Sequence, residues 1–123
     1  AQFNLGYMYE NGRGVVQDFT EAASWYRLAA KQGNARAQSF LGVMYHYGQG
    51  VIQDNVYAHM WLNIAASSGD DVALKNRDII TKSMAAADIS KAQGLARACV
   101  QKRTLKKHMY CLKMMERELK IAF

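Results

Sequence analysis

The sequence contains no proline, only two cysteines and no long hydrophobic run. The lack of proline suits uninterrupted helices, because proline removes a backbone donor and kinks a helix. No apolar stretch approaches the roughly 20 residues that a membrane-spanning helix needs. The chain begins without methionine, and no charged segment followed by an apolar one is present, so no signal peptide is visible. We therefore expect Ala1 to be a truncated or processed end.

Patterns typical of catalysis, cofactor binding or metal binding are missing as well. His46, His59 and His108 include no pair at the i, i+4 spacing of a helical zinc site, and no Cys-x2-Cys motif occurs. We interpret each histidine as an isolated surface residue. Residues 12–17 (GRGVVQ) lack the third glycine of a dinucleotide-binding loop. No serine or cysteine lies in a nucleophile signature, so we expect no catalytic residue, no cofactor and no metal.

The two cysteines, Cys99 and Cys111, are interpreted as free thiols. On one continuous helix they would lie ~18 Å apart, too far for a disulfide. A turn near residues 103–106 would bring them together, and an oxidised pair would favour an exported protein.

The formal net charge of +6 belongs to one end of the chain. Residues 1–96 hold 8 basic and 8 acidic residues, whereas residues 97–123 hold 8 basic and 2 acidic ones. The chain has 123 residues, half of them hydrophobic, which is enough for one domain with a modest core. The basic character is therefore a property of the C-terminal tail.

The organising feature of the chain is an internal repeat. Residues 1–33 match residues 37–69 at an offset of 36, with sixteen identities and no gap. Both copies follow the pattern Ala-x3-Leu-Gly-x2-Tyr-x2-Gly-x-Gly-Val-x2-Asp-x3-Ala-x2-Trp-x3-Ala-Ala-x2-Gly. A fixed period of this length indicates a stacked-repeat architecture.

Each copy is predicted to form a helix–loop–helix hairpin. Apolar residues at i, i+3 and i+4 predict a first helix, which Gly12 and Gly48 end as left-handed caps. Asp18 and Asp54 are expected to cap the second helix, and Glu21 to complete a capping box with Asp18. One face of each second helix carries small residues beside a tryptophan: Ala22, Trp25 and Ala29, then Ala58, Trp61 and Ala65.

Two features predict close packing between these helices. Gly6 and Gly42 recur inside the first helices, where glycine costs ~1 kcal/mol relative to alanine, which suggests close approach of a neighbouring backbone. A single hairpin cannot bury its apolar side, so neighbouring hairpins must stack. We therefore expect Trp25 and Trp61 to be buried in like surroundings.

The pattern resembles the Sel1-like repeat, a relative of the tetratricopeptide repeat, and both copies carry every position of it. The resemblance implies an all-α fold, an α-solenoid of antiparallel helix–loop–helix repeats in a right-handed superhelix. It also implies an adaptor or scaffold that binds other proteins, as among bacterial exported or envelope proteins. The expected units are residues 1–36, residues 37–72, a degenerate capping repeat over 73–103 and a basic amphipathic helix over 104–123.

The third unit starts in register at Ala73, but the rest of the pattern does not follow. Asp70 or Asp71 is expected to cap a helix running to about Ser83, and Asp88 to cap another. That second helix would carry one apolar face: Ile89, Ala92, Leu95, Ala96 and Cys99.

Residues 104–121 are predicted to form one more amphipathic helix with an apolar stripe: Leu105, Met109, Leu112, Met115 and Leu119. We expect it to dock on the end of the array. The alternatives are a helix that projects to a partner and one that lies on an acidic surface. Nucleic-acid binding is less favoured, since only Tyr110 and Phe123 are available for stacking.

In hairpin stacks of this kind the first helix of each pair lines the concave side. We therefore expect the partner-binding positions on that side to be Phe3, Tyr7, Glu10, Asn11, Ser39, Val43, His46 and Tyr47. None of these positions matches between the copies, unlike the packing positions. Their aromatic rings would anchor an extended peptide, or merely cover the groove.

The sequence thus favours a non-enzymatic protein–protein interaction module that binds a peptide or protein partner on its concave face. The alternative is envelope-surface or nucleic-acid association through the basic C-terminal helix. A hydrolase like the cysteine-rich relatives is disfavoured, because neither full repeat contains a cysteine. We also expect self-association through the uncapped N-terminal hairpin. The compartment stays open between exported, periplasmic and cytoplasmic.

Overall fold

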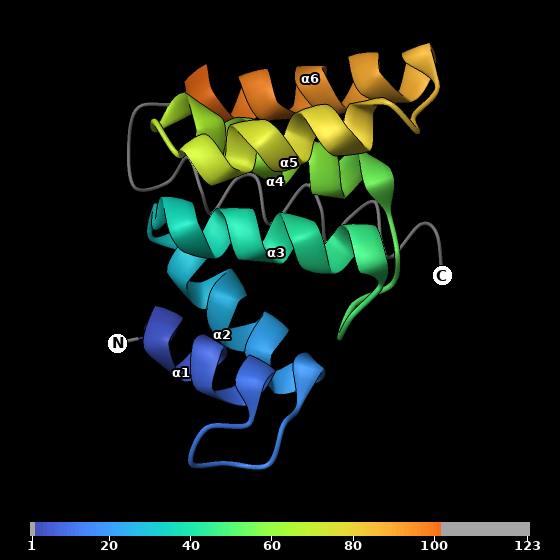
Figure 1. Cartoon of the computed structure of the whole chain (residues 1–123). Helices are drawn as coiled ribbons and strands as arrows, with labels where there is room; N and C mark the ends of the chain where they lie inside the picture. The colour runs from blue at the N-terminus through green and yellow to red at the C-terminus, as the bar shows by residue number, and fades with distance from the viewer. Residues whose placement is uncertain (1, 102–123) are drawn as a thin grey trace.

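A computed structural model describes the backbone of residues 2–101 and the side chains up to Arg97. The described part is all-helical, with six α-helices and short connections (Figure 1). In chain order they are α1 (Gln2–Asn11), α2 (Phe19–Lys31), α3 (Ala35–Tyr47), α4 (Asn55–Ser67), α5 (Asp71–Thr81) and α6 (Ala86–Gln101). The predicted helix at 104–121 and the side chains of Cys99 and Cys111 lie outside the described residues.

The first four helices form two hairpins that stack in one direction (Figure 1). Helix α1 packs against α2, and α3 packs against α4, while α2 and α3 join the two hairpins. The core runs continuously between them and is centred on Leu41, Met44, Tyr45 and Trp61, all at most 1% exposed. The predicted stack of helical hairpins is confirmed.

The predicted caps are confirmed in both copies. Gly12 and Gly48 end the first helices with φ of 68° and 70°, a region that glycine enters without steric cost. The side chain of Asp18 accepts from the Glu21 amide, and Asp54 caps α4 in the same way. The reciprocal bond of a capping box is absent, because the Asp18 N–H donates instead to the Tyr9 carbonyl at 2.9 Å. That part of the prediction was wrong.

The recurring helix glycines do mark close approach. A Cβ on Gly42 would lie 3.0 Å from the Ala58 carbonyl oxygen and 2.9 Å from Leu62 Cγ. On Gly6 it would lie 2.7 Å from the Tyr26 ring. Tyr26 and Leu62 occupy the same repeat position, so each glycine makes room for the large residue opposite. The predicted approach of backbone holds at Gly42, whereas at Gly6 the neighbour is a side chain.

The two tryptophans differ in their surroundings, contrary to prediction. Trp61 is completely buried, whereas Trp25 is only half-buried. The difference follows from the helices around them. Helix α4 is covered by α3, α5 and α6, but α2 is covered chiefly by α1 and α3.

The third unit begins in register and then departs from it. Helix α5 starts 36 residues after α3, and Asn34 and Asp70 cap the two helices through identical 2.9 Å bonds to Ala37 and Ala73. The connection to α6 spans only residues 82–85, whereas residues 12–18 and 48–54 connect the earlier pairs. Helix α6 then packs mainly against α4 and only marginally against α5.

The start of α6 corrects one prediction. The helix begins at Ala86, so Asp88 lies inside its first turn and is not the N-cap. A carboxylate there still favours the helix by facing the positive end of its dipole. Ala92 and Ala96 are buried, which confirms the apolar face predicted for this segment.

Candidate functional site

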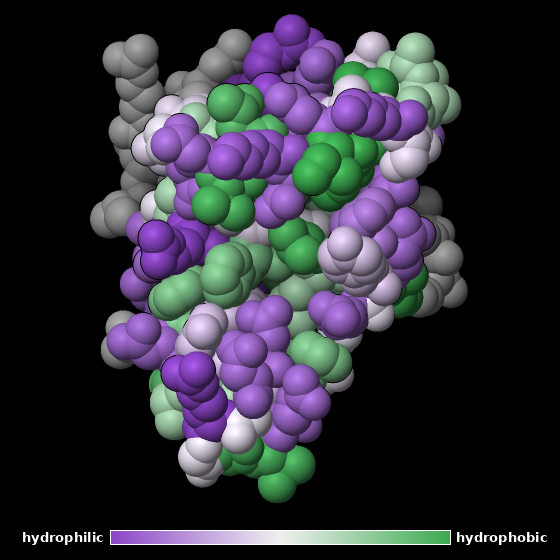
Figure 2. Space-filling view, in the orientation of Figure 1, coloured by the Kyte–Doolittle hydropathy of each residue, from purple (hydrophilic) through white to green (hydrophobic). Residues whose placement is uncertain are grey.

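The first helices of the three units share one face of the molecule, on which a groove opens. Figure 2 shows apolar side chains between polar ones over α3 and α5 on this side. The groove has a volume of about 460 Å³ and draws residues from α1, α3, α5, the start of α2 and two loops. We call it the concave groove; its lining is Tyr7, Glu10, Asn11, Gln17, Phe19, Phe40, Val43, Gln49, Val72 and Asn76.

Aromatic rings build one wall of the concave groove. Phe40 lies with its ring centroid 5.3 Å from Phe3, 5.4 Å from Tyr26 and 6.4 Å from Tyr7. Tyr26 is fully buried, whereas Tyr7 is 36% exposed at the groove surface. The cluster joins α1, α2 and α3, so the exposed ring stands on a rigid base. Arg13 adds a cation 5.6 Å from the centre of the Tyr7 ring.

Glu10 is held in a fixed position beside this wall. The Tyr26 hydroxyl donates to Glu10 Oε1 at 2.7 Å. Burial, and then the bond to Glu10, raise the pKa of the Tyr26 hydroxyl far above its ordinary value. The hydroxyl therefore stays a donor, and the Glu10 carboxylate keeps its remaining oxygen for another partner.

Two amide side chains close the end of α1 at the groove. Asn11 Nδ2 donates to the Tyr7 carbonyl at 2.9 Å, and Gln17 Nε2 donates to the Glu10 carbonyl at 2.8 Å. The second bond satisfies a carbonyl that the helix end would leave free. The two bonds also orient each amide, whose oxygen remains an acceptor on the groove surface.

The structure brings together four of the eight predicted site residues, namely Tyr7, Glu10, Asn11 and Val43. Phe3 is half-buried in the aromatic wall and does not line the groove. Ser39 is 1% exposed, so its prediction as a partner contact was wrong. Its position on α3 faces the packed interior.

His46 and Tyr47 lie away from the concave groove. Their rings are 4.8 Å apart and nearly perpendicular, and Tyr47 is 67% exposed. His46 Nδ1 lies 2.8 Å from Asn55 Oδ1, an oxygen that also accepts from Gln53. Because that oxygen only accepts, Nδ1 carries the proton.

Sequence reasoning missed Phe40, Val72 and Asn76. Phe40 and Asn76 stand at one repeat position, immediately after the position of Ser39. The residue type at position 40 could have indicated this lining residue. Phe40 replaces Asn4 of the first copy, and a large ring at a position that does not pack in both repeats favours an exposed contact. The choice between neighbouring positions depends on helix rotation, which the repeat pattern does not give.

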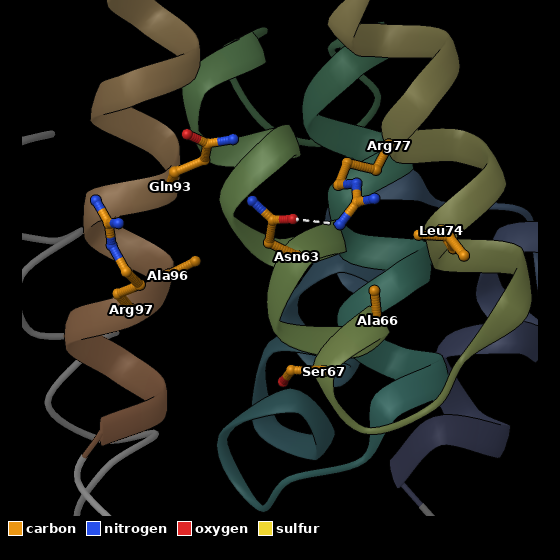
Figure 3. A pocket seen from close by; sticks show the side chains of 8 residues that line it. All are labelled: Asn63, Ala66, Ser67, Leu74, Arg77, Gln93, Ala96 and Arg97. Atoms are coloured by element: carbon orange, nitrogen blue, oxygen red, sulfur yellow. Dashed lines mark hydrogen bonds between the residues drawn. The ribbon is translucent and has the colours of Figure 1, made fainter.

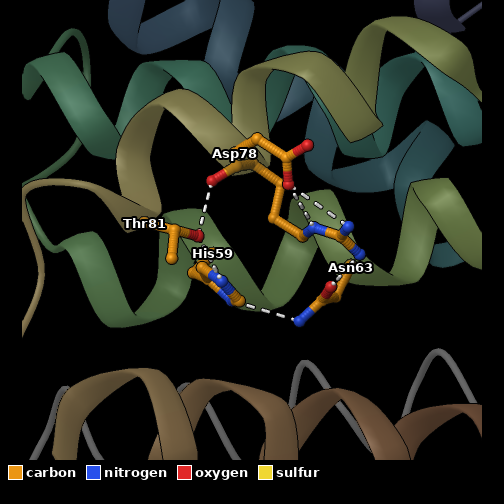
Figure 4. Close-up of polar contacts among 5 residues, drawn as sticks. His59, Asn63, Asp78 and Thr81 are labelled. Carbon is orange, nitrogen blue, oxygen red and sulfur yellow. Dashed lines mark hydrogen bonds and ion pairs between the residues drawn. The ribbon is translucent and has the colours of Figure 1, made fainter. Parts of the chain in front are cut away.

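A second polar cluster links α4 to α5 (Figure 4). His59 Nε2 lies 3.0 Å from Thr81 Oγ1, and Asn63 Nδ2 lies 3.1 Å from His59 Nδ1. Arg77 donates to Asn63 Oδ1 at 2.9 Å, and Thr81 Oγ1 donates to the Arg77 carbonyl at 2.7 Å. His59 is 2% exposed, so its interpretation as a surface histidine was wrong.

The bonds of this cluster fix the protonation of His59. The Thr81 hydroxyl donates its one proton to the Arg77 carbonyl, so its oxygen must accept the bond from His59 Nε2. Asn63 accepts from Arg77 through its oxygen, so its NH2 group donates to His59 Nδ1. The ring is therefore neutral. Burial, and then the nearby charge of Arg77, lower the pKa of His59, against a smaller opposing effect of Asp78.

Comparison with known families matches the Sel1 repeat at residues 1–34 and 35–70. The chain belongs to the Sel1 repeat family. The two matches meet where α3 begins. Sel1 repeat proteins are in general protein-interaction modules and are typically not enzymes.

Solved structures of bacterial Sel1 proteins share this fold. The crystal structure of c5321, a protective antigen present in uropathogenic Escherichia coli strains with an SLR fold, is 35% identical with a TM-score of 0.79. That match covers 91% of this chain and 24% of the other. A Sel1 repeat protein from Oxalobacter formigenes is 44% identical with a TM-score of 0.61, over 63% of this chain and 58% of the other. The α-solenoid prediction is confirmed.

The chain thus spans about a quarter of c5321 and somewhat more than half of the Oxalobacter protein. No curated protein matches this sequence significantly. Within residues 2–101, every helix is too short or too polar to cross a bilayer.

Proposed function

We propose that the concave groove binds an extended peptide segment of a partner protein. The observation that carries this proposal is the lining: an exposed tyrosine packed in an aromatic cluster and four amide side chains line the same groove. The membership of this chain in a family of interaction modules supports the same reading.

The apolar part of the lining supplies the contact energy. Tyr7, Phe40 and Val43 come from adjacent first helices and present apolar surface at the groove. A rigid tyrosine is a common anchor in protein interfaces, because it buries a large area at little entropic cost. Phe19 and Val72 extend the apolar surface at both sides.

The polar part of the lining suits a peptide backbone. Asn11, Gln17, Gln49 and Asn76 each present an amide, and an amide matches both the N–H and the C=O of an extended chain. Glu10 is the one charged residue among the described lining residues. Its fixed carboxylate would select a hydrogen-bond donor or a basic side chain at one position of the peptide.

The test uses peptides selected from a random library against the whole chain, with affinity measured by fluorescence anisotropy. Tyr7→Ala is expected to weaken binding at least about tenfold, since loss of a central aromatic anchor costs more than about 1.4 kcal/mol. Tyr47→Ala is the matched control, because Tyr47 is an exposed tyrosine outside the groove. The affinity of the Tyr47→Ala variant for the peptide should stay within about twofold of that of the unchanged chain. Equal losses in the two variants, or none in Tyr7→Ala with helicity retained, would place the site elsewhere.

A further inference from the structure

A separate pocket of about 580 Å³ opens between α4, α5 and α6 (Figure 3). It shares no residue with the concave groove. Its described lining is Asn63, Ala66, Ser67, Leu74, Arg77, Gln93, Ala96 and Arg97. The volume lies in the range of small-ligand and side-chain binding sites.

The pocket exists because the third pair of helices is spread apart. Helix α6 packs mainly on α4 and leaves a space beside α5, whereas the earlier pairs pack directly helix on helix. Only four residues connect α5 to α6, so the Gly-x-Gly-Val loop that closes the earlier hairpins has no counterpart.

The residues at the pocket are not those that packing alone would select. Arg77 stands at the repeat position of Leu41, which is completely buried in the second unit. Asp78 and Thr81 likewise replace the glycine and tyrosine of the pattern. The third unit has therefore exchanged core positions of α5 for polar ones, and of these three residues Arg77 lines the pocket.

The charge of the lining is entirely positive. Arg77 from α5 and Arg97 from α6 stand on opposite walls, with the Asn63 and Gln93 amides and the Ser67 hydroxyl between the helices (Figure 3). No carboxylate occurs among the described lining residues. Asp78 contacts Arg77 at 3.3 Å, but it is 65% exposed and lies outside the pocket.

Hydrogen bonds to neighbouring side chains hold the Arg77 guanidinium in place. Its Nη1 donates to Asn63 Oδ1 at 2.9 Å, and Asn63 is in turn held by the buried His59. Its Nε and Nη2 donate to Asp78 Oδ1 at 3.4 and 3.3 Å. A guanidinium fixed in this way needs less ordering when it binds an anion, and the N–H groups that remain on Nη1 and Nη2 can donate to a carboxylate.

We propose that this pocket binds a carboxylate side chain of an acidic peptide segment. Leu74, Ala66 and Ala96 would contact the methylene groups of a glutamate, while the two arginines pair with its charge. The chain's own residues 102–123 do not suit the pocket, since they hold seven basic and two acidic residues. The pocket shares no lining residue with the concave groove, so a result that refutes one of the two proposals does not refute the other.

The test is an amide-resolved NMR titration of the whole chain with acetylated tetraglutamate amide, with tetraglutamine as the uncharged control. We expect shift changes at the amides of Asn63, Ser67 and Gln93 with the acidic peptide alone. Arg77→Gln and Arg97→Gln should each weaken binding at least about tenfold, because a hydrogen bond to a charged group contributes about 1.5–3 kcal/mol. Arg36→Gln, which removes an exposed arginine of α3 outside the pocket, should have no such effect.

Three results would overturn the proposal. The first is that the shift changes are confined to residues after Gln101. The second is that Arg36→Gln weakens binding of the acidic peptide as much as the pocket variants do. The third is that tetraglutamine binds as tightly as tetraglutamate. Arg77→Gln also removes a bond to Asn63, so circular dichroism must show its helicity unchanged. If Arg77→Gln misfolds, Arg97→Gln decides the test, because Arg97 is exposed and its replacement should leave the fold intact. Unchanged affinity in Arg97→Gln would then exclude the pocket.

Discussion

A buried histidine stands at position 59, where the first repeat has the buried Ala23. Both of its ring nitrogens are bonded within the α4–α5 cluster, and the bond that Nδ1 accepts from Asn63 requires a neutral ring. A second ring proton would point at the Asn63 NH2 group, which is itself a donor. Protonation of His59 would therefore break its bond to Asn63, the residue that holds Arg77 of α5.

This residue predicts a pH-dependent stability. The unfolded histidine takes up a proton near pH 6.5, whereas in the folded chain the pKa of His59 is lowered. Its contribution is thus complete above about pH 6.5 and is lost as the pH falls below that value, by up to about 1.4 kcal/mol for each unit. Urea denaturation between about pH 7.5 and pH 5 should show this loss in the native chain.

His59→Gln is the control for that measurement, because it removes the ring and keeps the other two histidines. The variant should be less stable at neutral pH and should show a shallower fall in stability toward pH 5. Identical pH slopes in the two chains would show that His59 does not titrate with unfolding.

Among the elements, the pairing of α3 with α4 depends on one small residue. Gly42 has no room for a Cβ, since Leu62 Cγ and the Ala58 carbonyl oxygen would lie within 3.0 Å of it. Gly42→Ala is therefore expected to destabilise the chain by about 1–3 kcal/mol through overpacking. Chemical denaturation monitored by circular dichroism would measure the change.

Gly94→Ala provides the matched control in α6, because a Cβ there meets no atom within 4 Å. In a helix interior that change should be stabilising by about 0.5–1 kcal/mol, since alanine has the higher helix propensity. If both variants lost stability to the same extent, close helix packing at Gly42 would not be the cause.

Much of the fold at the scale of elements could be predicted from the sequence. The glycines and aspartates that bound the first four helices recur at a fixed spacing, and their caps depend on local geometry alone. The path of α6 could not be predicted, because it depends on contacts with α4 that no repeated residue specifies.

The candidate site was predictable only in part for a related reason. Tyr7 and Val43 follow from the rule that first helices face the concave side. Ser39 and Phe40 are neighbours in sequence, yet only the second lines the groove. A rotation of the helix by a fraction of a turn decides between them, and this rotation is set by tertiary packing.

At the scale of the whole molecule, the net charge belongs to a different part of the sequence from the residues of the proposed peptide site. The concave groove has one charged residue in its described lining, whereas the net charge of +6 belongs to residues 97–123. Association of that tail with an acidic surface or nucleic acid, its docking on the array, and self-association of the N-terminal hairpin all stay predictions.

This separation predicts how salt should act. Peptide binding in the concave groove should change by less than about threefold between about 50 and 200 mM salt, because few charges are involved. Binding of nucleic acid through the tail would fall steeply over the same range. Isothermal titration calorimetry at the two concentrations measures the difference. A steep loss of peptide affinity would show that the tail, and not the groove, holds the peptide.

The three first helices also set a length. Helices in direct contact lie about 8–10 Å apart. Because α1 packs chiefly on α2 and not on α3, a ligand that crosses from α1 over α3 to α5 travels at least about 20 Å. An extended chain rises about 3.3 Å per residue. A peptide bound in the proposed way would therefore contact the three helices through at least about six residues, the size of a short linear motif within an unstructured region.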